Sequence, residues 1–173
     1  MGAGELNIVV RRLRHADLSQ VSDIFGWYAI NSVATFEESP RGETDWSALA
    51  AELDGLGLPF LVAEADGAVA GYAYAGPWRR KAAYRATVED SIFIAPGKTG
   101  RGIGRLLLAD LLTACAACGI RQVIAVIADS GAGAEASVGL HESCGFTHAG
   151  RLADVGFKGG NWIGTLLMQR TVG

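Results

Sequence analysis

The sequence predicts an α+β fold in which helices flank a central mixed β-sheet. Apolar residues recur with the periods of strands and helices in the order strand, helix, helix, three strands, helix, strand, helix and two strands. The segment QVIAVIA, residues 122–128, is apolar on both faces, which is typical of a buried central strand. With 173 residues, half of them hydrophobic, the chain can bury a substantial core, and we expect residues 1–173 to form a single domain.

The N-terminal quarter predicts one strand and two helices. Residues 6–12 have the composition of a strand. Asp17 stands where a residue would cap a helix that runs to about Asn31. Thr44 stands at the corresponding position before a second helix, DWSALAAEL.

A hairpin, a strand and a long helix follow. Residues 59–76 predict two strands joined through Asp66-Gly67, because this dipeptide adopts the positive φ angles of a tight hairpin turn. Residues 87–96 predict a strand that ends at Pro96, and residues 102–118 predict a helix. The apolar stripe of that helix consists of Ile103, Leu107, Leu111 and Cys115.

The remaining elements follow the apolar strand at residues 122–128. A helix is expected at about 134–144 and ends at Gly145. Two strands, about 146–153 and 162–170, complete the sheet.

Composition excludes several classes of protein. The net charge is −3, so nothing favours general attraction to nucleic acid or anionic membranes. MGAGELN has no secretory apolar region, Leu6 stands where a myristoylation signal would have Ser or Thr, and Asp110 interrupts the richest apolar run. We therefore expect a soluble cytoplasmic protein with no nucleic-acid and no membrane partner.

The three cysteines do not predict a metal site. Cys115 and Cys118 form a CxxC inside the predicted helix without a second pair at zinc spacing, and Cys144 is alone. We expect all three to pack as small buried hydrophobic residues, and we expect no metal.

The glycine-rich stretch KTGRGIG, residues 98–104, admits three interpretations as a phosphate site. A P-loop would need glycine at position 92, where Ile92 stands. A dinucleotide fingerprint is disfavoured because Arg105 replaces its third glycine, and because only 44 residues follow Asp129. A pyrophosphate bound to backbone N–H groups at a helix N-terminus needs only the residues present. A plain strand-to-helix turn remains the alternative without a ligand.

Four stretches carry a resemblance to a known family. TGRGIGRLLL after DSIFIAP resembles motif A of the GNAT N-acetyltransferases, whose pattern Q/R-x-x-G-x-G/A binds the pyrophosphate of acetyl-CoA. SVGLHESCGF resembles the second CoA-side motif of that family. The match is closest to its phosphinothricin and methionine sulfoximine acetyltransferase branch, which has similar TFEE, TVEDSIFI, LHE and VGFKGGNW segments in this order.

The resemblance implies a GNAT fold, acetyl-CoA as the co-substrate and a homodimer. It also implies that strand residues Ile92, Phe93 and Ile94 offer backbone groups to the pantetheine arm. The expected pyrophosphate contacts are Thr99, Gly100, Arg101, Gly102, Ile103, Gly104 and Arg105. Two positions depart from the family pattern: Thr99 replaces the usual Gln or Arg, and Ala134 replaces an Asn three residues before Ser137.

Acetyl transfer to an amine needs a base, because the amine is protonated near neutral pH. By resemblance to the TVE segment of the branch, Glu89 is the leading candidate; Asp90 should point to the opposite face of the strand. His141 is the second candidate and could act as acid or base, since imidazole titrates near neutrality. Without a catalytic role, Glu89 would be a solvated strand residue and His141 a packed or exposed structural histidine.

The acceptor is expected near a local cluster of positive charge, WRRKAAYR, residues 78–85. Guanidinium groups of Arg79 and Arg80 suit the carboxylate, phosphinate or sulfone oxygens of a small amino acid, and Tyr84 is a further expected contact. By analogy with the branch, Phe36 and Lys158 would line the opposite wall. A solvated loop is the competing interpretation.

The sequence thus predicts an acetyl-CoA-dependent N-acetyltransferase acting on the primary amine of phosphinothricin, methionine sulfoximine or methionine sulfone, by direct attack in a ternary complex. Two alternatives remain open at this point. The same fold could acetylate another amine, such as a protein N-terminus. It could also serve as a non-catalytic acyl-CoA-binding regulator.

Overall fold

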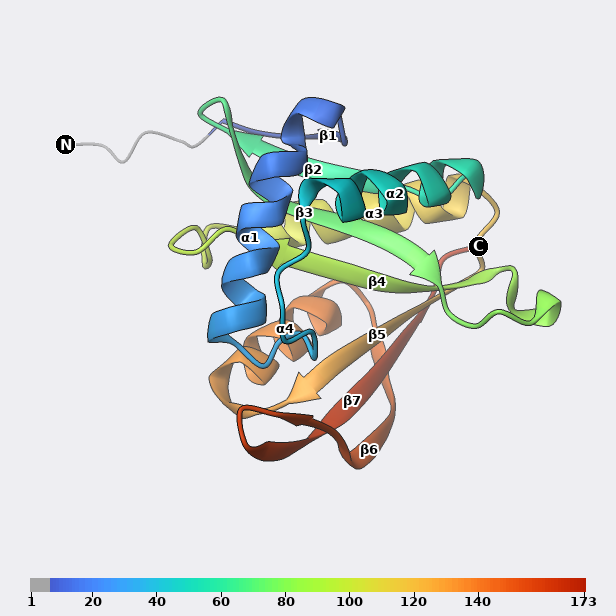
Figure 1. The fold of residues 1–173 in the computed structure, drawn as a ribbon. Helices are drawn as coiled ribbons and strands as arrows, with labels where there is room; N and C mark the ends of the chain where they lie inside the picture. The colour runs from blue at the N-terminus through green and yellow to red at the C-terminus, as the bar shows by residue number, and fades with distance from the viewer. Residues whose placement is uncertain (1–6) are drawn as a thin grey trace.

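The computed structural model describes residues 7–173 and confirms the predicted order of strands and helices (Figure 1). Leu6 and the N-terminal segment before it, for which a strand start and the absence of a targeting signal were predicted, lie outside the described residues. The strands are β1 (Ile8–Arg12), β2 (Phe60–Ala65), β3 (Ala68–Pro77), β4 (Thr87–Ile94), β5 (Gln122–Asp129), β6 (Thr147–Lys158) and β7 (Asn161–Thr171). The α-helices are α1 (Leu18–Asn31), α2 (Glu43–Gly55), α3 (Ile103–Ala117) and α4 (Gly131–Ser143).

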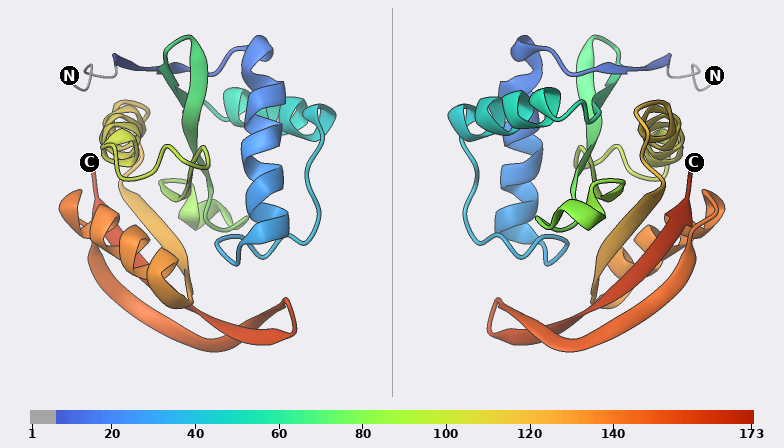
Figure 2. Two further views of the ribbon diagram at one scale, coloured as in Figure 1. Left: turned by 90° about the vertical axis from the view of Figure 1, so that its left-hand side faces the viewer. Right: turned by 90° about the vertical axis from the view of Figure 1, so that its right-hand side faces the viewer.

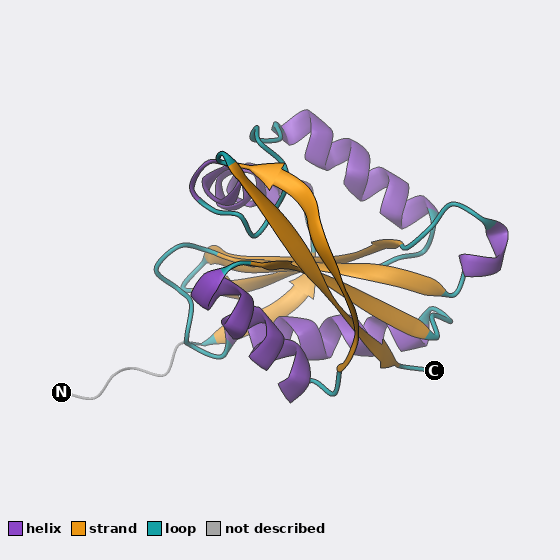
Figure 3. Ribbon diagram, turned by 90° about the horizontal axis from the view of Figure 1, so that it is seen from below, coloured by secondary structure: helices purple, strands orange, loops and turns teal. Residues whose placement is uncertain are grey.

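The seven strands form one sheet in the order β1-β2-β3-β4-β5-β7-β6. All neighbouring strands pair antiparallel except β4 and β5, which are parallel, so the sheet is mixed as predicted. α1 and α2 cover one face, and α3 and α4 cover the other (Figure 2). Figure 3 shows the twist of the sheet between these two helical layers.

The predicted stripe of α3 is buried in the larger of two hydrophobic clusters. Ile103, Leu107, Leu111 and Cys115 are each at most 1% exposed and pack against the central strands. Full burial of a leucine side chain contributes about 1.5–3 kcal/mol. This helix therefore anchors the segment that begins immediately after the glycine-rich stretch.

Two predicted helix caps are wrong in detail. Asp17 stands at the N-cap of α1, but its carboxylate accepts hydrogen bonds from the Arg11 guanidinium and the Arg14 backbone N–H instead. The N-cap of α2 is Gly42 rather than Thr44, and the Asp45 carboxylate accepts the Gly42 N–H. At α1 other donors occupy the carboxylate of the capping residue, whereas α2 begins at Glu43, ahead of its predicted N-cap, and Asp45 bonds back to the N-cap backbone.

Several element boundaries differ by one or two residues from the prediction, such as β4, which ends at Ile94 rather than Pro96, and two differ by more. α4 begins at Gly131 rather than about 134, so an exposed glycine-rich stretch of low intrinsic helix propensity forms its first turn. β6 continues to Lys158 rather than ending near 153, because an irregularity in its pairing between Leu152 and Gly156, with Asp154 at φ 52°, breaks the alternation seen in sequence. A turn at Gly159-Gly160 then leads into β7.

Cys115 and Cys144 are buried as expected, but Cys118 is exposed, because α3 ends at Ala117 and Cys118 follows its last turn. Residues 7–173 contain no cluster of three or more His, Cys, Asp or Glu side chains arranged to hold a metal ion. Over the same range, no helix has the length and hydropathy needed to cross a membrane.

Candidate active site

The site begins where β4 and β5 separate. The two strands pair only from Thr87–Glu89 to Gln122–Ile124, although both continue further in the same direction. Beyond this point β4 still pairs with β3, and β5 still pairs with β7. The facing edges of β4 and β5 therefore carry backbone groups that do not pair with each other.

A cavity of about 1290 Å³ occupies this separation. Both strands line it, together with the C-terminal half of α1, the loop between α1 and α2, α4 and the turn of the β6–β7 hairpin. Its walls include Glu89, Asp90, His141, Phe36 and Lys158, which come from four separate parts of the chain. The fold thus brings together the two predicted catalytic residues and two of the predicted acceptor contacts.

Glu89 is partly buried and lies at the last position of β4 that pairs with β5. Burial raises the pKa of its carboxyl group, the negative charge of Asp90 adds to this, and the positive charge of Arg79 opposes it. A carboxylate whose charged form is disfavoured is a better proton acceptor. The environment therefore suits Glu89 to the predicted role of base.

Asp90 lies on the opposite face of β4, as the alternation of the strand predicts. Its Oδ2 is 3.0 Å from Nε2 of His141, and both side chains are almost completely buried. His141 Nδ1 lies 2.7 Å from the Ser137 carbonyl oxygen. Burial lowers the pKa of His141, but the hydrogen bond and charge of Asp90 outweigh it, so the pKa is raised. Sequence reasoning placed Asp90 correctly but assigned it no function.

The glycine-rich stretch forms the turn before α3, and Gly102 is the N-cap of that helix with φ 80°. Gly97, Gly100 and Gly102 all adopt positive φ, which favours glycine. A Cβ at these positions would meet nothing within 4 Å, so the turn presents open backbone. The first N–H groups of an α-helix have no partner within the helix. Thr99 and Arg101 are exposed in this turn, which does not line the cavity.

Three predicted CoA contacts within the first turn of α3 differ in their surroundings. The Ile103 side chain belongs to the core, so only its backbone can face a ligand. Gly104 packs against Leu140 of α4, whose Cδ2 would lie 3.2 Å from an added Cβ. The Arg105 side chain is exposed. On β4, Ile92, Phe93 and Ile94 all line the cavity, and the Ile94 carbonyl accepts a hydrogen bond from the Tyr28 hydroxyl.

Lys158 holds the loop between α1 and α2 over the cavity. Its ammonium group donates to the Thr35 carbonyl at 2.8 Å and to the Glu37 carbonyl at 2.7 Å. Burial lowers the pKa of Lys158, and the neighbouring Glu38 and Glu37 oppose this. The Phe36 ring, in the same loop, lies against Gly156, where an added Cβ would overlap it. Both residues therefore fix the wall of the site on which we expected them.

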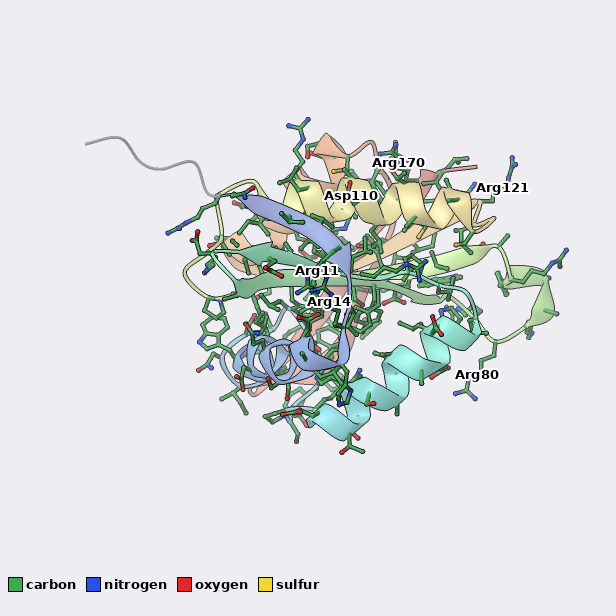
Figure 4. All side chains as sticks on the ribbon, turned by 90° about the horizontal axis from the view of Figure 1, so that it is seen from above. Arg11, Arg14, Arg80, Asp110, Arg121 and Arg170 are labelled. Atoms are coloured by element: carbon green, nitrogen blue, oxygen red, sulfur yellow. The ribbon has the colours of Figure 1, made fainter. Side chains whose placement is uncertain are left out.

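The remaining predicted acceptor contacts lie outside the lining of the cavity. Arg79, Arg80 and Tyr84 are exposed in the loop between β3 and β4, and Arg79 stacks on the ring of Trp78. Figure 4 shows Arg80 at the periphery of the molecule. Instead, Arg41 supplies a guanidinium to the cavity wall, held over the rings of Phe25 and Trp46. No sequence motif pointed to Arg41, because its place in the wall depends on the path of the loop before α2.

With this geometry in hand, comparison with known proteins identifies the family. The model of the acetyltransferase (GNAT) family matches residues 21–146. The chain belongs to the GNAT family of acetyltransferases. This confirms the predicted family, enzyme class and fold.

Three GNAT relatives show the branch. The chain is 48% identical over 161 residues to phosphinothricin N-acetyltransferase of Alcaligenes faecalis, covering 93% of this chain and 81% of that protein. It is 33% identical to an L-methionine sulfoximine/L-methionine sulfone acetyltransferase of Salmonella typhimurium, covering 94% and 93%. The crystal structure of a GNAT phosphinothricin acetyltransferase from Sinorhizobium meliloti in complex with AcCoA superposes with a TM-score of 0.91 and 41% identity, covering 97% and 90%. The predicted resemblance to this branch is confirmed.

Proposed function

We propose that this protein transfers the acetyl group of acetyl-CoA to the primary amine of a small amino acid, such as phosphinothricin, methionine sulfoximine or methionine sulfone. The observation that carries the proposal is the cavity between β4 and β5, with the carboxylate of Glu89 at the point where the strands part. The names of the relatives at 48% and 33% identity support the substrate class.

The residues present fit acetyl-CoA. The edge of β4 at Ile92, Phe93 and Ile94, unpaired on the side toward β5, offers backbone groups to the pantetheine arm. The open backbone of residues 99–105 and the N-terminus of α3 suit a pyrophosphate. When bound, acetyl-CoA supplies the acetyl thioester, whose carbon–sulfur bond breaks as the carbon–nitrogen bond forms.

Glu89 and His141 divide the proton transfers between the two faces of the sheet. Glu89 lies on the face covered by α1 and α2, and accepts a proton from the nitrogen of the amine as it attacks. His141 lies behind β4, on the face of α3 and α4, and gives a proton to the departing sulfur. The raised pKa of each group moves it toward neutral pH, where both transfers are efficient.

The acceptor lies on the Glu89 face, between β4 and the loop that Lys158 holds. Phe36 and Lys158 form its far wall. Arg79 acts through its charge on Glu89, and Arg80 and Tyr84 extend the same loop. Each of these three remains a proposed acceptor contact.

We also propose that the protein works as a single-domain cytoplasmic homodimer. Large apolar side chains are exposed on the β6–β7 hairpin: Leu152, Val155, Phe157 and Trp162. The rings of Phe157 and Trp162 lie 5.1 Å apart, and a second copy of the chain would cover such a patch. Sedimentation equilibrium at micromolar concentration tests this, and a monomer would contradict it.

Release of free CoA thiol with a panel of amines tests the function. Turnover of methionine sulfone, methionine sulfoximine or phosphinothricin is the expected result. Turnover of peptides alone would indicate acetylation of protein N-termini. Binding of acetyl-CoA without turnover of any amine would indicate a regulator.

A further inference from the structure

The buried pair of Asp90 and His141 links β4 to α4 across the wall of the cavity. Nε2 of His141 lies 3.0 Å from Asp90 Oδ2, and Nδ1 lies 2.7 Å from the Ser137 carbonyl oxygen. A carbonyl oxygen and a carboxylate only accept hydrogen bonds, so both ring nitrogens carry a proton in this arrangement. With Asp90 ionised, this arrangement favours the imidazolium form of His141 with Asp90 as its counter-ion, which agrees with the raised pKa of the ring.

Among the groups around the His141 ring, Asp90 supplies the negative charge that favours the protonated ring. Glu89 lies on the other face of the strand. From α3, Cys115 is buried, and burial, the Cys118 thiol and the Asp90 charge raise the pKa of its thiol to about 12, so it is neutral. β5 lines the same part of the cavity with the apolar residues 125–128, and on the ring's own helix the contact is the Ser137 carbonyl.

The second carboxylate oxygen of Asp90 is not used in this pair. Oδ1 is buried and has no hydrogen-bond partner among residues 7–173. A carboxylate that served only to hold α4 on the sheet would be expected to use both oxygens, because an unpaired buried oxygen is costly. Its placement in the cavity wall points to a part in the reaction.

We propose that Asp90 is a positioning residue for acetyl transfer, orienting the His141 ring and keeping on Nε2 the proton that the departing sulfur takes up. The inference rests on the proposed function. The amine loses its first proton to solvent and attacks as the neutral base, and Glu89 receives a second proton from its nitrogen while the carbon–nitrogen bond forms. The carbon–sulfur bond breaks with its electron pair on sulfur, and His141 transfers its Nε2 proton there by exchanging its hydrogen bond to Asp90. Solvent then restores the proton to His141 and removes the one on Glu89.

Without Asp90 the same ring would lose its proton. Burial by itself disfavours the charged imidazolium and lowers its pKa. A neutral ring that donates Nδ1–H to Ser137 has no proton on Nε2 to give. The substitution Asp90→Asn keeps the size of the side chain and removes the charge.

The first test is an NMR titration of the histidine rings in the protein without coenzyme. The His141 signal is assigned by its loss in His141→Gln. We expect the wild-type ring to be protonated at pH 7 and to titrate above an ordinary histidine, and the ring of Asp90→Asn to titrate at lower pH. Glu142→Gln is the matched control, because Glu142 follows His141 on α4 and its change breaks only an exposed pair with His148 of β6. A wild-type ring that is neutral at pH 7, or an unchanged titration in Asp90→Asn, would overturn the proposal.

The second test is the pH dependence of kcat with methionine sulfone. Activity that needs protonated His141 falls as pH rises through the pKa of the ring, so this fall should begin at lower pH in Asp90→Asn. We expect kcat at pH 8 to drop about 100-fold or more in Asp90→Asn and in His141→Gln. The double variant should be no worse than the worse single variant, because both changes remove the same proton. Additive losses, or full activity in Asp90→Asn, would refute the positioning role.

Two further measurements distinguish a loss of folding from a failure of the proposed function. Circular dichroism shows whether Asp90→Asn folds; if it does not, the wild-type titration alone decides whether the pair is charged. If no amine is turned over by the wild-type enzyme, the proposed function fails. A His141 ring that is nevertheless protonated at pH 7 would then show that Asp90 sets its charge, but without a part in acetyl transfer.

Discussion

Replacement of Glu89 by glutamine tests the proposed base most directly. The side chain is partly buried at the last paired position of β4, and its influential charged neighbours are Asp90 and Arg79. Glutamine keeps the length and shape of the side chain but cannot accept the amine proton at neutral pH. The change therefore isolates proton transfer from packing.

The expected loss follows from the role of the group. A positioned general base contributes about 10²–10⁴ in rate, which corresponds to about 2.7–5.5 kcal/mol in the activation barrier. We expect kcat to fall within that range. The affinity for acetyl-CoA should change less than about twofold, because the proposed CoA contacts are backbone groups of β4 and of the turn before α3.

Stability should not fall at neutral pH. The pKa of Glu89 is raised in the folded protein, so its ionised form costs stability at pH values above that pKa, and this cost vanishes below the unfolded pKa. Glu89→Gln should therefore equal or exceed the wild type in thermal midpoint at pH 7. At pH 3 the difference should disappear.

Stopped-assay thiol release between pH 5 and 9 gives the decisive comparison. The wild-type kcat/KM should rise with pH through the raised pKa of Glu89, and the variant should lack this rise. Glu38→Gln is the control, since Glu38 lines the same cavity but is exposed. A Glu89→Gln enzyme that keeps more than a tenth of wild-type kcat would refute the assignment of Glu89 as base.

Three other outcomes follow from the same structure. Gly102→Ala forces a side chain into a φ of 80°, at about 1–2 kcal/mol, and should weaken acetyl-CoA binding about tenfold by calorimetry; unchanged affinity would argue against the turn as the pyrophosphate site. Lys158→Met removes two hydrogen bonds to the loop and should raise the acceptor KM about tenfold, with acetyl-CoA affinity unchanged as the internal control. Leu111→Ala, at a fully buried position, should lower the free energy of unfolding by about 2–5 kcal/mol in urea, whereas the exposed Leu106→Ala should cost much less.

Local patterns determined much of the fold. The buried stripe of α3 could be predicted because a 3.6-residue period fixes which side chains face the core. The turn at Asp66-Gly67 could be predicted because few residues tolerate a positive φ angle. Alternation along β4 placed Glu89 and Asp90 on opposite faces. Element boundaries were less well determined where the observed element runs against local propensity, as at Gly131.

Contacts between distant segments were decided only by the tertiary structure. His141 meets Asp90 across 51 positions, and Lys158 meets Thr35 across 123, because sheet order and the separation of β4 from β5 bring these segments together. The same geometry leaves Arg80 outside the cavity and puts Arg41 in its wall. Sequence by itself identified the residue types and motifs of an acetyltransferase. Which side chains share a proton depended on three-dimensional proximity, since hydrogen bonds act over about 3 Å whatever the separation along the chain.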